Sequence, residues 1–123
     1  MIRPDRAKSF SEAMRICFVV IKNLQKLIKK KGLSTSVGDE GGFAPMINNN
    51  NQALDLIVSA IKKSGFVNGK DVSICLDVAA NELINEKGEY SIQSKNFTTV
   101  EDNISYYKTV SYTHLTLPTI YSV

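Results

Sequence analysis

The chain has 123 residues, 43% of them hydrophobic, which is enough to bury one modest core, so a single domain is the default expectation. Its formal net charge of +3 is mild, and the basic residues gather between Lys26 and Lys31 without interleaved aromatic residues. This distribution disfavours a nucleic-acid-binding module and suits the solvated carboxyl end of a helix.

The cysteines and the apolar runs indicate a cytoplasmic type of chain. Cys17 and Cys75 lie in apolar runs with no CxxC motif or Cys/His ligand spacing, so we expect two buried free thiols and a reducing compartment. No apolar run approaches the roughly 18 residues of a membrane span. Arg3, Asp5 and Arg6 interrupt any signal peptide, so we expect no membrane partner.

The first part of the chain predicts the end of a strand followed by a long helix. Residues 1–4 read as a short extended segment because of the proline, and Ser9 or Ser11 can cap the helix that follows. From Glu12 to Lys31, apolar residues recur at spacings of three and four, which predicts an amphipathic helix that Gly32 ends. The predicted apolar stripe consists of Met14, Cys17, Phe18, Ile21, Leu24, Leu27 and Ile28.

Residues 38–45 form a glycine-rich acidic turn, Gly-Asp-Glu-Gly-Gly-Phe-Ala-Pro. Glycine allows the backbone to adopt positive φ angles and to approach a ligand closely. Loops presented by a rigid scaffold often carry function, so the carboxylates of Asp39 and Glu40 are candidate functional groups. Neighbouring side chains in an extended turn often point apart, so one of the two can face a site while the other orders the loop.

The second part predicts a helix, a buried strand and a further helix. Residues 48–51 read as an uncapped polar loop before a helix that Ser64 and Gly65 close. Its predicted buried stripe consists of Leu54, Ile57, Val58 and Ile61. Residues 72–78 are apolar nearly throughout, which is typical of a strand in a parallel sheet. A short strand at residues 90–92 and a helix capped by Thr98 or Thr99 follow.

Asp77 stands at the carboxyl end of the predicted buried strand. Acids on a loop and at a strand end, in a helix–loop–helix–strand order, suggest a piece of an α/β barrel, since barrels place their chemistry at the carboxyl ends of strands. From the residues alone, capping of the next turn is the favoured role for Asp77, whereas for Glu40 bonding to N–H groups of its own turn and a functional role are equally good interpretations. Glu82 can support Asp77 or be a solvated acid.

The segment 111–123 changes character and loses helical periodicity. It resembles a peptide that arises when sequencing-adaptor DNA is translated, so we expect residues 1–110 to be the protein fragment and residues 111–123 to be a non-native tail. The alternative is a genuine edge strand. His114 lies in this segment and receives no catalytic role.

Three segments in the same order resemble the enolase family. They are residues 1–4 with 9–13, residues 36–45, and residues 69–74 with 76–82, so the resemblance covers about residues 1–110. The glycine-rich acidic turn is the most specific of them. The resemblance implies an α/β fold, namely an incomplete part of a (β/α)8 TIM-like barrel of the enolase type. Asn81-Glu82-Leu83 departs mildly from the family's Ser-Glu-Phe.

The resemblance also implies an activity and roles for two residues. Enolases are lyases that dehydrate 2-phospho-D-glycerate to phosphoenolpyruvate in glycolysis, with Mg²⁺, as cytoplasmic homodimers. By resemblance, Glu40 is the general acid and Asp77 is one of three carboxylate ligands of the tightly bound Mg²⁺. The family's base lysine and its other metal ligands lie outside the matching residues, so we expect the isolated chain to be inactive. The alternative is a non-catalytic interaction module with an enolase-like helix–loop–helix.

Overall fold

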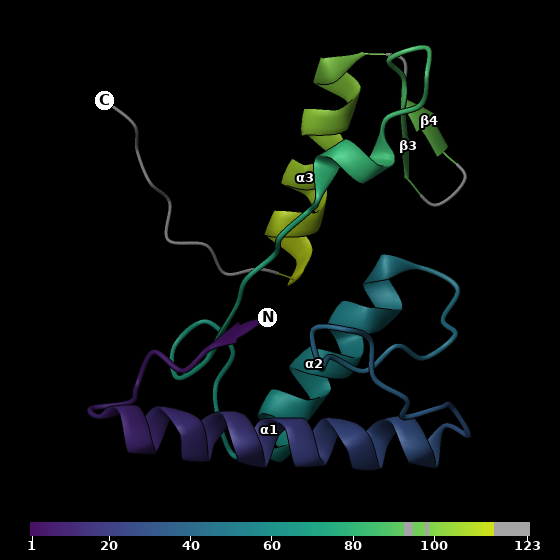
Figure 1. The fold of residues 1–123 in the computed structure, drawn as a ribbon. Coiled ribbons are helices and arrows are strands. Elements are labelled where there is room, and N and C mark those ends of the chain that lie inside the picture. Colours follow the sequence, from purple (N-terminus) through teal and green to yellow (C-terminus); the bar gives the residue numbers. More distant parts are fainter. Residues whose placement is uncertain (93–94, 98, 115–123) are drawn as a thin grey trace, which may run out of the picture.

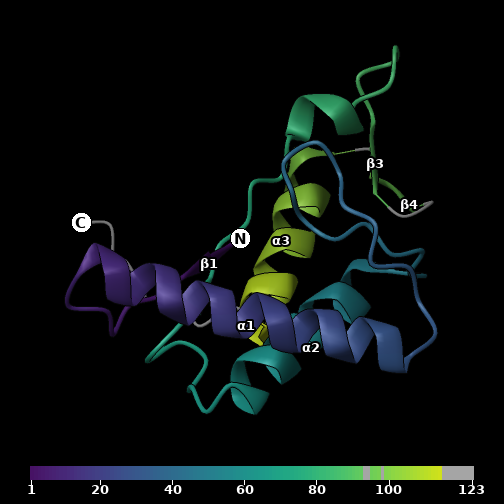
Figure 2. The same ribbon diagram turned by 60° about the horizontal axis from the view of Figure 1, so that its bottom comes forward.

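The computed structural model describes residues 1–92, 95–97 and 99–114 as three helices, four short strands and one 3₁₀ turn. Helix α2 packs against α1 on one side and against α3 on the other, and α3 lies with the β3–β4 hairpin away from α1 (Figures 1 and 2). The element bounds, in chain order, are β1 Ile2–Arg3, α1 Phe10–Lys30, α2 Asn50–Lys63, β2 Ser73–Ile74, η1 Ala80–Leu83, β3 Tyr90–Ile92, β4 Lys95–Phe97 and α3 Val100–His114.

Helix α1 begins and ends where its local sequence predicts. Ser9 is the N-cap, and its hydroxyl accepts a hydrogen bond from the Glu12 N–H at 3.2 Å. At the other end, Gly32 has a φ of +71°, and the Leu33 N–H donates to the Ile28 carbonyl at 3.2 Å. This is a Schellman ending, in which a left-handed glycine lets the chain turn away from the helix.

The buried face of α1 differs from the predicted stripe. Ile16 and Val20 are buried in the core, whereas Met14 is 55% exposed and Phe18 is 59% exposed. The apolar surface of α1 is wider than the area that α2 and β2 cover, so only one flank of it is buried in the described chain. The prediction of the helix was therefore right, and the prediction of which flank it buries was partly wrong.

Helix α2 has a cap that the sequence reading missed. The Asn49 side chain accepts from the Gln52 N–H at 2.9 Å, and the Gln52 side chain accepts from the Asn48 N–H at 3.2 Å. The expectation of an uncapped loop at residues 48–51 is thus wrong, because the Asn49 side chain satisfies one N–H group in the first turn of the helix and the Gln52 side chain reaches back to the residue before the cap. The ending at Ser64 and Gly65 is confirmed.

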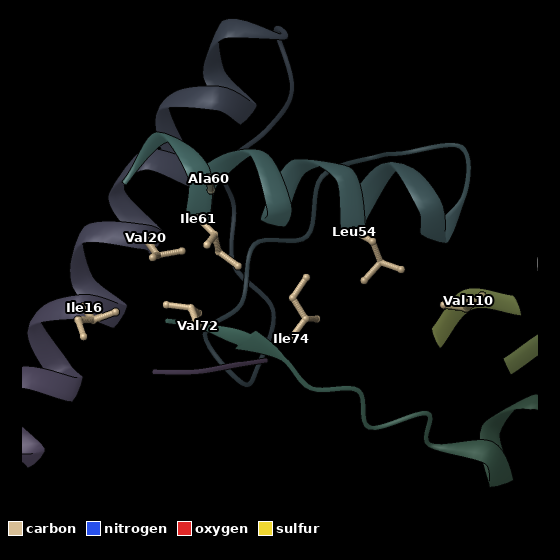
Figure 3. Packing of buried hydrophobic residues seen from close by; sticks show 8 residues of the cluster. All are labelled: Ile16, Val20, Leu54, Ala60, Ile61, Val72, Ile74 and Val110. Carbon is tan, nitrogen blue, oxygen red and sulfur yellow. The ribbon is translucent and has the colours of Figure 1, made fainter. Parts of the chain in front are cut away.

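A single apolar cluster joins the three helices and β2 (Figure 3). Between α1 and α2 it is supplemented by a polar bridge, in which Asn23 donates to the Ser64 hydroxyl at 2.9 Å and Ser64 donates to the Ala60 carbonyl at 2.7 Å. Because these polar groups satisfy one another, the helices can approach closely without an unpaired donor. The buried cluster consists of Ile16, Val20, Leu54, Ala60, Ile61, Val72, Ile74 and Val110.

The strand after α2 pairs in the direction opposite to the one expected. Strands β1 and β2 are antiparallel, with Ile2 opposite Ile74, and the Cys75 N–H extends the ladder to the Met1 carbonyl at 2.9 Å. The prediction that residues 72–78 form a strand of a parallel sheet is therefore wrong, because β2 pairs with β1 in the antiparallel direction. Val72 and Ile74 are the buried residues of this run, while Leu76 is exposed. The strand is therefore not buried along its whole predicted length.

A carboxylate ties β1 to β2. Asp5 accepts hydrogen bonds from the Ser73 hydroxyl and from the Arg3 guanidinium. Burial raises the pKa of the Asp5 carboxyl, but these hydrogen bonds and the charge of Arg3 outweigh it and hold the pKa below its usual value. The carboxylate therefore remains ionised at neutral pH and fixes the start of the chain against the body of the protein.

The last described elements are the β3–β4 hairpin and α3. Thr99 caps α3 by accepting from the Asp102 N–H at 3.1 Å, which confirms one of the two predicted caps, whereas Thr98 lies outside the described residues. Strand β4 was not predicted. Helix α3 continues to His114, beyond the residue where the sequence loses periodicity, and residues 115–123 of the predicted tail lie outside the described residues.

Cys17 and Cys75 are both free, as expected, but both are half-buried rather than buried. Within the described ranges, no helix has the length and apolar character needed to cross a membrane.

Candidate functional site

The glycine-rich acidic turn is the tip of a small hairpin. Val37 and Phe43 form an antiparallel bridge, flanked by hydrogen bonds from the Gly38 N–H to the Gly42 carbonyl and from the Ala44 N–H to the carbonyl of residue 36, both at 2.9 Å. The Gly41 N–H closes the tip by donating to the Gly38 carbonyl at 2.9 Å. A turn followed by a residue with positive φ is a common way to build a three-residue hairpin loop.

Asp39 and Glu40 occupy the two central positions of this turn, and both are exposed. The backbone of the tip is satisfied by its own carbonyl groups. In the described part of the chain, neither carboxylate accepts a hydrogen bond from the N–H groups of the turn. The structural role considered for Glu40, bonding within its own turn, is thus not what the structure contains.

Gly41 is the residue whose replacement the turn should tolerate least. Its φ is +79°, and alanine in this left-handed conformation costs about 1–2 kcal/mol. We expect Gly41→Ala to lower the free energy of unfolding by about 1 kcal/mol in urea denaturation. Gly42→Ala is the matched control, because Gly42 has an ordinary φ and open space around its Cα. Equal losses in the two variants would contradict this assignment.

Asp77 lies past the end of β2 and is exposed. Its Oδ1 atom accepts a hydrogen bond from the Ala79 N–H at 3.0 Å, and Ala79 has a φ of +46°. The carboxylate thus stabilises an unusual left-handed backbone conformation just before the 3₁₀ turn η1. This is the structural role that the sequence left open, and it engages one of the two carboxylate oxygens.

The two candidate carboxylates are held by different segments. Glu40 lies between α1 and α2, whereas Asp77 follows β2, and no hydrogen bond or ion pair in the described residues links them. Glu82 lies in η1 and is exposed. Among the residues that the structure describes, no group of three or more His, Cys, Asp and Glu side chains is placed to hold a metal ion.

The residues present nevertheless suit part of a magnesium site. Mg²⁺ prefers carboxylate oxygens and usually takes only one or two of them from the protein, together with water. Asp77 supplies a hard oxygen ligand, with one oxygen fixed by Ala79 and the other not used by the described hydrogen bonds. The donor chemistry therefore fits, but a tight site needs ligands from further residues.

An apolar cavity of about 390 Å³ lies beside the hairpin. It is bounded by Ile21 and Leu24 of α1, by Leu56 of α2, and by Phe43 and Pro45 of the hairpin itself. Neither Glu40 nor Asp77 lines it. The cavity is therefore a packing feature of the hairpin rather than the place where the carboxylates act.

Sequence reasoning did not single out the polar residues on α3. Asn103 is 7% exposed, and Tyr107 lies one helical turn further on. Burial raises the pKa of the Tyr107 hydroxyl above its usual value. The hydroxyl therefore stays protonated at neutral pH, and these residues add no charge to the candidate site. The sequence did offer a signal, because Asn103 and Tyr107 are four residues apart and so lie on the same face of a helix.

Comparisons with known proteins identify similar sequences. A family model described as "Enolase, C-terminal TIM barrel domain" matches residues 1–121. A curated protein named "Enolase" from Pelagibacter ubique (strain HTCC1062) is 74% identical over 110 residues. That alignment covers 89% of this chain and 26% of the relative, so the chain spans about a quarter of the relative's length.

Proposed function

The chain belongs to the enolase family and corresponds to part of its C-terminal TIM barrel domain, and from this premise we propose that it serves within a longer enzyme. That enzyme dehydrates 2-phospho-D-glycerate to phosphoenolpyruvate. The 74% identity to a protein named enolase, over 89% of this chain, is the observation that carries the proposal. We further propose Mg²⁺ as its cofactor, the cytoplasm as its location and a homodimer as its assembly, which rest on the family resemblance.

In this proposal Glu40 is the general acid. Elimination of water requires the C3 hydroxyl to leave, and a positioned carboxylic acid lowers the barrier by donating a proton to it. Two features support this role: the Glu40 carboxylate is exposed at the tip of a hydrogen-bonded turn, and it is not tied to the N–H groups of that turn. Such a group is free to meet a substrate that other parts of the protein hold.

Asp77 holds the metal in the same proposal. Bound Mg²⁺ would supply electrostatic stabilisation of the negative charge that builds on the substrate carboxylate as the C2 proton is removed. The protein's part is to fix the ligand, and the hydrogen bond from the Ala79 N–H orients the Asp77 carboxylate before any cation arrives. The second oxygen is then presented at a defined angle.

The isolated chain should lack activity, since by the family resemblance it holds one of three metal carboxylates and the general acid, while the base lysine lies outside the matching residues. We expect the purified 123-residue chain to form no phosphoenolpyruvate from 2-phosphoglycerate with Mg²⁺, measured by ultraviolet absorbance of the product. The positive control is a chimera of the Pelagibacter ubique protein, in which its 110 matched residues are replaced by the corresponding residues of this chain. We expect the chimera to turn over in a Mg²⁺-dependent manner.

The two assays test separately whether the isolated chain is inactive and whether the proposed function is right. Turnover by the isolated chain would overturn the expectation of inactivity. A folded but inactive chimera would overturn the proposed function. If the isolated chain then proved to be a monomer with a cooperative melting transition, the non-catalytic interaction module would be favoured instead.

We also propose that residues 1–110 are the enolase fragment and that residues 111–123 are a non-native tail. The change in sequence character after residue 110 supports this division, whereas the family match to residue 121 runs against it. Reading the genomic DNA across these codons decides: a native reading frame that continues through residues 111–123 would refute the proposal.

A further inference from the structure

The acidic turn needs an anchor outside its own hydrogen bonds. Backbone hydrogen bonds fix the shape of the hairpin between residues 36 and 44, but they do not fix how the hairpin lies against the helices. The two carboxylates at the tip are exposed. The direction in which Glu40 is presented must therefore be set by side chains further down the hairpin.

Phe43 is the large apolar side chain by which the hairpin faces the helices across the cavity. It is half-buried and lines the cavity together with Ile21 and Leu24 of α1 and Leu56 of α2. Pro45 lies two residues further on and lines the same cavity. The neighbouring Met46, in contrast, is 88% exposed.

The backbone of Phe43 is coupled directly to the acidic turn. Val37 and Phe43 are a non-hydrogen-bonded pair, because the two hydrogen bonds of the hairpin lie on either side of them. The inner of these bonds joins Gly38 to Gly42, which are the residues that flank the tip. We therefore expect a displacement of Phe43 to reach Glu40 through the hydrogen-bonded backbone of the hairpin.

We propose that Phe43 is a positioning residue, which anchors the acidic turn on α1 and α2 and so fixes the approach of Glu40 to the substrate. This rests on the proposed function, in which Glu40 is the general acid. The cavity of about 390 Å³ beside the ring provides space into which the hairpin can shift when the ring is removed. A misplacement of about 1 Å in a catalytic group can cost roughly 100-fold in rate.

The test compares three variants in the chimera described above. We expect Phe43→Ala to lower kcat by about 10-fold with a smaller change in KM, because the acid is misplaced while substrate binding is largely kept. Phe43→Leu should restore most of the rate, since it refills the apolar contact. Met46→Ala, which removes an exposed side chain from the same loop, should leave kcat unchanged.

A double variant separates positioning from general damage to the fold. If Phe43 acts through Glu40, Phe43→Ala should add little to the loss already caused by Glu40→Gln, whereas independent effects would multiply. A full 10-fold further loss in the Glu40→Gln background would overturn the proposal, as would an equal loss in Met46→Ala.

An activity-independent readout covers the case in which the proposed function itself fails. In the 123-residue chain, amide hydrogen exchange of residues 38–42 should be faster in Phe43→Ala than in Met46→Ala, because the hairpin loses its contact with the helices. An inactive unsubstituted chimera would refute the proposed function. Equal exchange rates in the two variants would refute the anchoring of the turn.

Discussion

Glu40→Gln in the chimera is expected to lower kcat by about 10²- to 10⁴-fold, which is the usual contribution of a positioned general acid. Glutamine keeps the size of the side chain and its hydrogen-bonding capacity but cannot donate the proton that the leaving hydroxyl needs. Because Glu40 is exposed and makes no described hydrogen bond within its turn, the substitution should leave the stability of the protein unchanged. The loss should therefore appear in kcat and not in the melting temperature.

Asp39→Asn is the matched control for this experiment. Asp39 is the neighbouring residue in the same turn, is also exposed and carries the same charge. We expect its replacement to cost less than about 10-fold in kcat, since neighbouring side chains in such a turn point apart and only one carboxylate is assigned to proton donation. If the two variants lost activity equally, the effect would come from the charge of the turn, and the role of Glu40 as the acid would be refuted.

The local features of the fold could be predicted because they depend on a few neighbouring residues. The helix cap at Ser9 and the helix endings at Gly32 and Gly65 are confirmed. The cap at Asn49 was missed although its signal was present, since asparagine is a good N-cap and Gln52 lies three residues later. Local chemistry was therefore sufficient, and the error lay in not applying it.

The long-range features were harder to predict. Which flank of α1 is buried depends on the elements that pack against it, and the exposed Met14 and Phe18 fit the helical period as well as the buried Ile16 does. The antiparallel pairing of Ile2 with Ile74 likewise depends on the path of the chain through two intervening helices. An apolar run does not encode strand direction by itself.

In the candidate site, too, local features could be predicted from the sequence and features that depend on packing could not. The acidic turn and the position of Asp77 after a strand were visible in the sequence, and the resemblance supplied their roles. The hydrogen bond between Asp77 and Ala79 and the position of Phe43 at the cavity beside the helices were not visible, because they arise from backbone geometry and packing. The structure thus adds information about the surroundings of the two carboxylates rather than further candidate acids.

Asp77→Asn is expected to raise the Mg²⁺ concentration that gives half-maximal activity of the chimera by at least about 10-fold, while leaving its melting temperature unchanged. Loss of groups that merely support a metal ligand already costs 10- to 100-fold in affinity or activity, and replacing a charged ligand removes more. The asparagine carbonyl can still accept the hydrogen bond from the Ala79 N–H, which Asp77 accepts at 3.0 Å. The substitution therefore removes the carboxylate charge and keeps the turn.

Asp77→Ala completes the comparison, because alanine removes both the charge and the hydrogen-bond acceptor. It should weaken the Mg²⁺ dependence at least as much as Asp77→Asn and should also lower the melting temperature, since the left-handed backbone at Ala79 loses its partner. If Asp77→Asn had the Mg²⁺ requirement of the unsubstituted chimera and only Asp77→Ala were altered, Asp77 would be a turn residue and not a metal ligand. The pair of variants thus separates the two roles that one carboxylate can have at this position.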